Sequence, residues 1–396
     1  MGNSSAPPGW VSGLVSLVPI FPCCESVHHF RSHPCQVSWF PLEHLLVCKL
    51  TTYIDMTVGH DGQVRHLVCS PDSKWIATGG DDCTIILWDV SGRISQEWLA
   101  HTSRIQSLSF SPNSRYLVSC CLSDQVIVWK LEPSAHRVGA FAAGAPVGCC
   151  VWCPNGSVIA SRSDDGTICL WDTRMFRLKR VLPESMNAKA SRFLRFSPDG
   201  RWLATGDFAS LGIWDVTTGE IHQRLCWSER CIQDIAFDPT SARLASAFAS
   251  GIIKILKVKT GEELLRLGQC GTDEVMDVSF SSDGTLVISA SKDRTLKIWD
   301  ARGGILKFSL RRNAGLFRAA CFSLRGKYVA SPSSARTVRL WKVNDGSCVA
   351  TFRDHQSDVH CVALTPDGRT LSSVTVTGSV VIRQWRKHLL QKGLNT

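Results

Sequence analysis

Short runs of β-branched and aliphatic residues alternate with clusters of turn-forming residues along most of the chain. Seven of these runs lead into a tryptophan, and neighbouring tryptophans are 41–44 residues apart except across one gap of 85. They are Trp88, Trp129, Trp171, Trp214, Trp299, Trp341 and Trp385. The midpoint of the long gap falls on Leu256, at the end of an apolar run of the same kind. The pattern predicts eight repeating units, one of which has lost its tryptophan; seven units plus an irregular one is the alternative.

A second marker keeps the same register. Each unit has an apolar run followed by a turn that resembles Ser-Pro-Asp-Gly, as at residues 70–72 and 197–200. Proline presets φ in such a turn, and Asp, Asn or Gly tolerates its tight corner. A run rich in small residues, a second turn and the tryptophan run follow. With one more run before the next unit, the sequence predicts a four-stranded sheet about every 42 residues.

This pattern resembles the WD-repeat family, in which units of about 40–45 residues each build a four-stranded blade of a β-propeller. The resemblance covers residues 51–387. The Trp-Asp pair stands intact at Trp88-Asp89, Trp171-Asp172, Trp214-Asp215 and Trp299-Asp300. The resemblance implies an all-β fold of eight four-stranded blades. It also implies that an N-terminal strand, here residues 53–58, completes the last blade and closes the ring.

The family's buried hydrogen-bond network can be carried over in full to one unit only, as His60, Thr78, Asp82 and Trp88. Such a network satisfies polar groups that would otherwise destabilise the core. The fifth unit has Ser246 but neither the aspartate nor the tryptophan, and other units hold part of the set. We expect blades with a partial set to be less rigid than the first.

The composition is that of a soluble globular protein, with 44% hydrophobic and 20% charged residues. A formal net charge of +10 favours acidic partners without choosing among nucleic acid, anionic lipid and acidic peptide. The 18 cysteines are scattered through apolar runs, where free thiols act as small hydrophobes. We therefore expect a reducing compartment, cytoplasmic or nuclear.

Residues 1–50 do not follow the repeat. We expect a poorly ordered or partly docked extension there, and a propeller with a short basic tail over residues 51–396. The extension holds a Cys/His group between Cys23 and Cys48, but its spacing matches none of the usual zinc patterns, so no metal is expected. The apolar residues 11–21 are interrupted by Gly13 and Pro19 and are too short to span a bilayer, so no membrane association is expected.

The chain has no arrangement typical of catalysis. No Ser or Cys stands beside a base in a nucleophile motif, and no glycine-rich loop opens a helix. We therefore expect no enzyme activity and no cofactor. Binding to other proteins, in a multi-protein complex, is the function that remains.

Members of this family commonly bind partners at the rim where the chain enters each innermost strand, around the central channel. Matching the register gives one side chain per unit at this rim: Arg65, Gln106, Gly148, Arg192, Gln233, Met276, Arg318 and His360. Asp81, Asp164 and Lys292 are expected to flank it. Guanidinium groups bind carboxylate and phosphate bidentately. The hypothesis is a scaffold or adaptor that holds an acidic or phosphorylated segment; a merely solvated rim is the alternative.

A second hypothesis is a substrate receptor of a cullin-RING ubiquitin ligase. Two units end in Trp-Asp-x-Arg, at Arg174 and Arg302, as do WD-repeat receptors that contact a ligase adaptor. The signal is weak, because Arg after a tryptophan strand is common in propellers.

A third hypothesis is a chromatin-associated or nucleic-acid-associated regulator. The C-terminal residues Arg383, Arg386, Lys387, His388 and Lys392 are basic, but they are not interleaved with aromatic residues as in many nucleic-acid-binding segments. Direct binding to nucleic acid is therefore not favoured, and a solvated end is the simpler interpretation.

Overall fold

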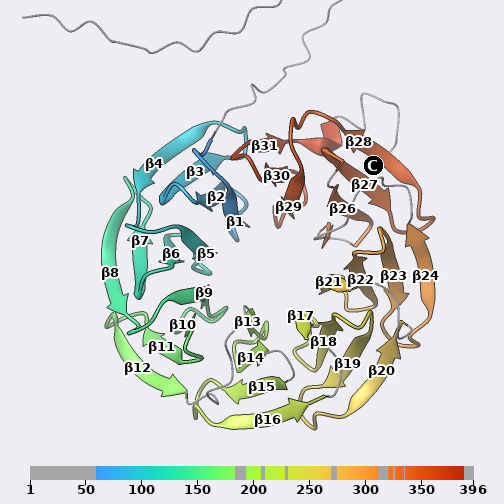
Figure 1. Cartoon of the computed structure of the whole chain (residues 1–396), viewed down its shortest axis with the longest axis horizontal. Helices are drawn as coiled ribbons and strands as arrows, with labels where there is room; N and C mark the ends of the chain where they lie inside the picture. The colour runs from blue at the N-terminus through green and yellow to red at the C-terminus, as the bar shows by residue number, and fades with distance from the viewer. Residues whose placement is uncertain are drawn as a thin grey trace, which may run out of the picture. The chain divides into compact units, whose positions relative to one another are not determined.

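The computed structural model of the protein describes residues 59–182, 193–206, 210–227, 231–268, 274–310, 320–323, 326–333 and 335–387. These residues form eight antiparallel sheets, arranged as blades around a common axis (Figure 1). In each blade the strands follow one another from the axis outward. The prediction of eight units is confirmed, and the fifth sheet contains Leu256.

The first four blades each have four strands, given from the innermost to the outermost. They are β1 (Val64–Cys69), β2 (Trp75–Gly80), β3 (Thr84–Asp89) and β4 (Ile94–Leu99); β5 (Ile105–Phe110), β6 (Tyr116–Cys121), β7 (Gln125–Lys130) and β8 (His136–Ala142); β9 (Val147–Trp152), β10 (Val158–Ser163), β11 (Ile168–Asp172) and β12 (Arg177–Leu182); β13 (Phe193–Phe196), β14 (Trp202–Gly206), β15 (Ser210–Asp215) and β16 (Ile221–Cys226).

The last four blades follow the same order. They are β17 (Ile232–Phe237), β18 (Arg243–Phe248), β19 (Ile253–Lys257) and β20 (Glu263–Leu267); β21 (Val275–Phe280), β22 (Leu286–Ser291), β23 (Leu296–Asp300) and β24 (Leu306–Leu310); β25 (Cys321–Phe322), β26 (Tyr328–Ser333), β27 (Thr337–Lys342) and β28 (Cys348–Phe352); β29 (Val359–Leu364), β30 (Leu371–Thr375) and β31 (Val380–Arg383). The eighth sheet therefore has three strands among the described residues. The predicted closing strand, residues 53–58, lies outside them, as does the extension of residues 1–50.

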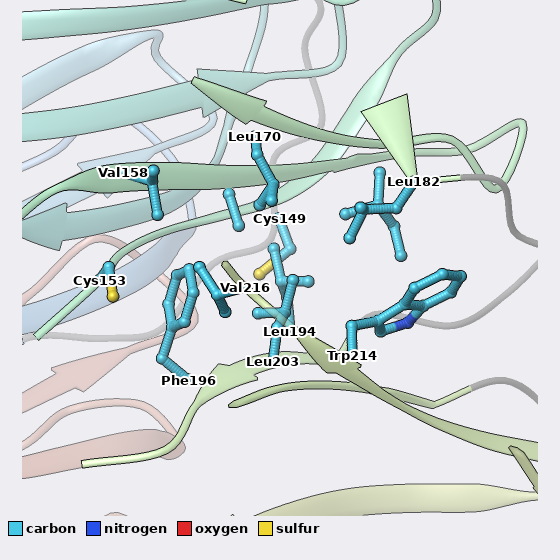
Figure 2. Packing of buried hydrophobic residues seen from close by; sticks show 12 residues of the cluster. Cys149, Cys153, Val158, Leu170, Leu182, Leu194, Phe196, Leu203, Trp214 and Val216 are labelled. Atoms are coloured by element: carbon cyan, nitrogen blue, oxygen red, sulfur yellow. The ribbon is translucent and has the colours of Figure 1, made fainter. Parts of the chain in front are cut away.

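The hydrophobic core lies between the blades. Figure 2 shows one cluster in which Val158 and Leu170 of the third blade pack against Leu203 and Trp214 of the fourth. Middle strands such as β10 are buried along their whole length because a neighbouring blade covers each face, whereas β12 at the outer edge is exposed. One cluster joins residues of the first and last blades, so core packing continues around the whole ring.

The tryptophan marker of the eighth unit was assigned to the wrong residue. Leu371 pairs with Arg383 as Ile76 pairs with Trp88, so Arg383 holds the tryptophan position. Trp385 lies two residues further on, in a single helical turn, and its ring meets that of Tyr328 at a centroid distance of 5.2 Å. In the sequence, Trp385 lies 44 residues after Trp341, whereas the other tryptophans that are one unit apart are separated by 41–43 residues. This longer spacing was the sign that Trp385 is out of register.

Candidate functional site

A β-bulge recurs at the start of the innermost strands. Val64 pairs with Gly80 and His66 with Gly79, so Arg65 between them has no partner in the ladder. The same register shift in five other blades leaves one residue of each without a ladder partner. These residues are Gln106, Gly148, Gln233, Met276 and His360. A bulge breaks the alternation of a strand and re-aims the side chain of its extra residue. Each of these residues is the second of its strand, where the sequence placed the rim.

We call this surface the bulge face, defined by Arg65, Gln106, Gly148, Gln233, Met276 and His360. All six are half-buried. Arg192 and Arg318, the other two predicted members, lie outside the described residues.

The predicted flanking residues do lie beside the start of the innermost strands. Asp81, Asp164 and Lys292 each directly follow the second strand of a blade. Their backbone N–H groups donate to the carbonyls of Gln63, Pro146 and Glu274, at 2.9, 2.7 and 2.9 Å. These carbonyls belong to residues at or just before the first strand, so the turn and the bulge are tied together.

Arg65 of the bulge face and Lys292 beside it each pair with a carboxylate. The Arg65 guanidinium donates Nε to Asp81 Oδ1 at 2.7 Å and Nη2 to Oδ2 at 3.2 Å. Lys292 pairs with Glu274. The two cations predicted for this rim that the structure describes, Arg65 and Lys292, therefore each have a carboxylate beside them.

A row of polar side chains on the innermost strands was missed by sequence reasoning. His66 Nδ1 accepts a hydrogen bond from the N–H of Leu108, and Asp234 and Asp277 accept from Val278 and Ala320, at 3.2, 3.3 and 2.8 Å. Each bond runs from one blade to the next. In the sequence these three residues have one feature in common. Each is a polar residue directly after the bulge residue of its innermost strand.

These inner groups have displaced pKa values. Burial, together with the charge of Arg195, lowers the pKa of His66 to about 4, so His66 is neutral and its Nδ1 can accept. Burial and the neighbouring Asp234 raise the pKa of Asp277 well above its usual value. Arg195 Nη2 lies 3.5 Å from Asp234 Oδ1 and compensates that carboxylate. The geometry is that of a structural tie between blades.

The buried network of the first blade has the predicted members. His60 Nδ1 donates to Asp82 Oδ2 at 2.9 Å, and His60 Nε2 lies 2.8 Å from Thr78 Oγ1. Trp88 Nε1 donates to the same hydroxyl at 2.9 Å. Burial lowers the pKa of His60, and Asp82 opposes this shift. Blade 1 thus satisfies the ring nitrogens of both His60 and Trp88.

The other blades hold parts of this network. Five more tryptophans donate to a Ser or Thr at 2.8–3.2 Å: Trp129, Trp171, Trp214, Trp299 and Trp341. His101 and His355 repeat the contact of His60, with Ser119 and Ser373 at 2.7 and 2.8 Å. No described residue partners their Nδ1 atoms, because Ser123 and Thr377 stand where the first blade has aspartate.

We call the opposite rim the turn face, defined by the residues that directly follow the tryptophan position, from Asp89 in the first blade to Lys342 in the seventh. Asp172 Oδ1 accepts from the N–H groups of Arg174 and Met175, both at 2.8 Å, and Asp300 accepts in the same way from Arg302 and Gly303. Arg174 and Arg302 are exposed on this face.

The remaining candidates from the sequence are the basic C-terminal residues and the Cys/His group of the extension. Arg383 does not belong to a basic tail, because its Nη1 donates to Asp354 at 2.7 Å and its guanidinium lies over Phe352. Residues 388–396 and the Cys/His group of the extension lie outside the described residues. Within the described ranges, no group of His, Cys, Asp and Glu side chains is arranged to hold a metal ion. No helix of those ranges is long and apolar enough to cross a membrane.

This geometry, eight blades with Trp-Ser/Thr pairs and a bulge face, defines a WD-type propeller. The family description "WD domain, G-beta repeat" matches residues 48–89, 92–130, 136–172, 261–300 and 346–382. The chain is 30% identical over 283 residues to the WD repeat-containing protein SL1-17 of Schistosoma mansoni, covering 69% of this chain and 90% of that protein. The chain belongs to the WD-repeat family.

Two other likenesses agree. The nuclear distribution protein PAC1 of Arthroderma otae is 27% identical over 335 residues, and the chain spans 65% of its length. The structure of Chaetomium thermophilum Sqt1 superimposes with a TM-score of 0.74 at 20% identity, over 83% of this chain and 97% of that one, which shows the shared fold. WD-repeat proteins are generally protein-interaction scaffolds, and their propeller is typically non-enzymatic.

Proposed function

We propose that this protein is a non-catalytic scaffold that docks a segment of a partner protein on its bulge face. The observation that supports this is the recurring bulge, which leaves one residue per blade without a ladder partner at the start of the innermost strand in six blades. In five of these blades that residue has a side chain, and in the third it is Gly148. The side chains so placed differ in size and charge. A bulge that recurs at the same position with different side chains is suited to recognition, because the packing of the blades does not fix which side chain stands there.

The partner segment in this proposal is acidic or phosphorylated. Asp81 holds the Arg65 guanidinium in a bidentate pair with about a third of each side chain exposed. A carboxylate or phosphate of the partner can replace Asp81 or bind the remaining N–H groups of Arg65. Gln106 and Gln233 add neutral donors and acceptors on the same rim. We place this function in the cytoplasm or nucleus.

The test is affinity purification with mass spectrometry on the full chain and on the triple variant Arg65→Gln/Arg192→Gln/Arg318→Gln. We chose Gln because it is already the bulge residue of the second and fifth blades, as Gln106 and Gln233, and so is compatible with a bulge. The matched control, Lys130→Gln/Lys257→Gln, changes two exposed residues of the turn face. We expect the triple variant to lose specific partners while its thermal unfolding midpoint is unchanged, and the control to keep them. Unchanged capture by the triple variant contradicts the proposal.

Receptor function in a cullin-RING ligase is the second candidate, favoured by the exposure of Arg174 and Arg302 in identical Asp-anchored turns. Both guanidinium groups are available to an adaptor. Under this function, Arg174→Ala/Arg302→Ala abolishes co-purification of the ligase adaptor, and the bulge-face variant retains it. Retention of the adaptor by the alanine variant excludes this function.

A further inference from the structure

The outermost strand of the third blade differs from its counterparts in charge. Strand β12 has Arg177, Lys179 and Arg180 within six residues, and Arg174 precedes it. No other outermost strand among the described residues has more than one Lys or Arg. None of these four cations lies within salt-bridge distance of a carboxylate in the described ranges.

The same strand and the turn before it expose apolar side chains next to their cations. Met175, Leu178 and Val181 are 64%, 47% and 47% exposed, and they are three of the ten large apolar side chains that the described surface exposes. Phe176, by contrast, is half-buried and packs over Gly139. Cations without exposed aromatic rings favour a peptide over a single-stranded nucleic acid, which uses stacking.

The backbone of β12 limits how a partner can bind. Trp171 pairs with Leu178 and Leu170 with Arg180, so Lys179 is the extra residue of a bulge. A bulge interrupts the edge ladder, and like charges on an edge oppose pairing with a second copy. Recognition at this edge therefore rests on side chains of opposite charge rather than on an added strand.

One of the cations is held in place by the next blade. A Cβ at Gly219, in the turn between β15 and β16, would overlap the side chain of Arg180. Arg180 therefore lies against the fourth blade, and this contact limits the positions that its side chain can take. Ordering before binding reduces the entropy lost on association.

We propose that β12 and its preceding turn form a second docking surface, the β12 edge, for an extended acidic segment of a partner protein with apolar residues between its carboxylates. The β12 edge is defined by Arg174, Met175, Arg177, Leu178, Lys179, Arg180 and Val181. It lies on the outer side of the ring, so its use leaves the bulge face free. A scaffold with both surfaces holds two partners at once.

The test uses the full chain and a short fluorescein-labelled peptide of alternating Glu and Val, with fluorescence anisotropy at physiological ionic strength. The variant Arg177→Gln/Lys179→Gln/Arg180→Gln is expected to bind the peptide at least about tenfold more weakly. The control Arg224→Gln/Lys257→Gln/Lys307→Gln removes three exposed cations from three other blades and is expected to bind within about twofold of the unmodified chain. Leu178→Ser/Val181→Ser is expected to weaken binding about fivefold.

Several outcomes overturn this proposal. Equal weakening by the two triple variants means that net charge alone attracts the peptide. Equal binding of a Lys-Val peptide excludes an acidic specificity. Tighter binding of single-stranded DNA or of phosphatidylserine vesicles than of the Glu-Val peptide, lost in the β12 variant, assigns the surface to another class of partner. All variants change exposed side chains, so an unaltered thermal unfolding midpoint verifies that they are folded.

Discussion

The first and fifth blades share a strand order and a bulge but differ in their buried polar groups. In the first, Thr78 accepts from Trp88 and contacts His60, which in turn donates to Asp82. In the fifth, Leu256 replaces the tryptophan, and Ser246 Oγ has no partner among the described residues. The blade geometry therefore does not depend on the network. We expect the network instead to set how strongly each blade resists opening.

The fifth blade has a different buried charge. The Lys254 side chain is 4% exposed, forms an ion pair with Glu263 at 3.1 Å, and lies over the rings of Trp227 and Phe248 at 5.2 and 5.7 Å. A cation enclosed by aromatic rings and one carboxylate is stabilised by both. The first blade thus accommodates polar atoms in its core by a hydrogen-bond network that ends on a carboxylate, and the fifth blade does so by an ion pair.

The largest expected difference in stability between the first and fifth blades follows from removing the central hydroxyl of each, which is that of Thr78 or of Ser246. Thr78→Val keeps the shape but leaves Trp88 Nε1 and His60 Nε2 without a partner, at a cost of about 3 kcal/mol. Ser246→Ala removes an oxygen that has no partner among the described residues, so a change within about 0.5 kcal/mol is expected. Denaturant unfolding followed by tryptophan fluorescence measures both. Similar losses from the two variants contradict the comparison.

Low pH extends this comparison to the buried histidines that have no aspartate partner, because protonation of such a histidine destabilises its blade. Burial lowers the pKa of His101 to about 4, whereas the unfolded chain binds that proton near pH 6.5. His101 therefore contributes stability above pH 6.5 that is lost as the pH falls toward 4, about 2.5 kcal/mol by pH 4.5. In His101→Gln the loss of stability from pH 7 to 4.5 should be smaller by about that amount. Parallel pH profiles of the two proteins would refute this role of His101.

A smaller effect is expected from the ion pair of the fifth blade. Glu263→Gln removes a carboxylate that pairs with the buried Lys254, and a cost of about 1–2 kcal/mol is expected because Glu263 is itself partly solvated. Lys254→Met keeps the apolar stem and leaves a carboxylate that water can reach, so it should cost less, within about 1 kcal/mol. Unfolding midpoints of the two variants decide the order. The reverse order would show that the charge is not enclosed.

The smallest expected effect is a gain. Ser123→Asp supplies the second blade with the carboxylate that Asp82 provides in the first, so His101 Nδ1 acquires an acceptor. Stabilisation of about 1 kcal/mol is expected, together with a higher pKa of His101. Ser123→Asn is the uncharged control and should not raise that pKa by charge attraction. No gain from the aspartate would mean that the turn of blade 2 holds position 123 too far from the ring.

The repeat was visible in the sequence because each unit carries several markers in one register. Blade number and the strand position of Gln106 followed from that register, and the network of His60 followed from the family resemblance. The inner row of His66, Asp234 and Asp277 did not, because each accepts from a backbone N–H of another blade and such a partner leaves no motif.

Two other features also needed the structure. The pairing of Arg65 with Asp81 depends on the register between two strands. Trp385 was misplaced because Arg383, paired with Asp354 and stacked on Phe352, occupies the position that tryptophan holds elsewhere.

The central claim, that partners dock on the bulge face, is tested most directly by photo-crosslinking in cells. Benzoylphenylalanine is placed at Gln106 or Gln233 on the bulge face, and at Lys130 or Lys257 on the turn face of the same two blades. The account predicts crosslinks to a discrete partner protein from the bulge-face positions and none to that partner from the turn-face positions. Crosslinks to that partner only from Lys130 or Lys257 would contradict it.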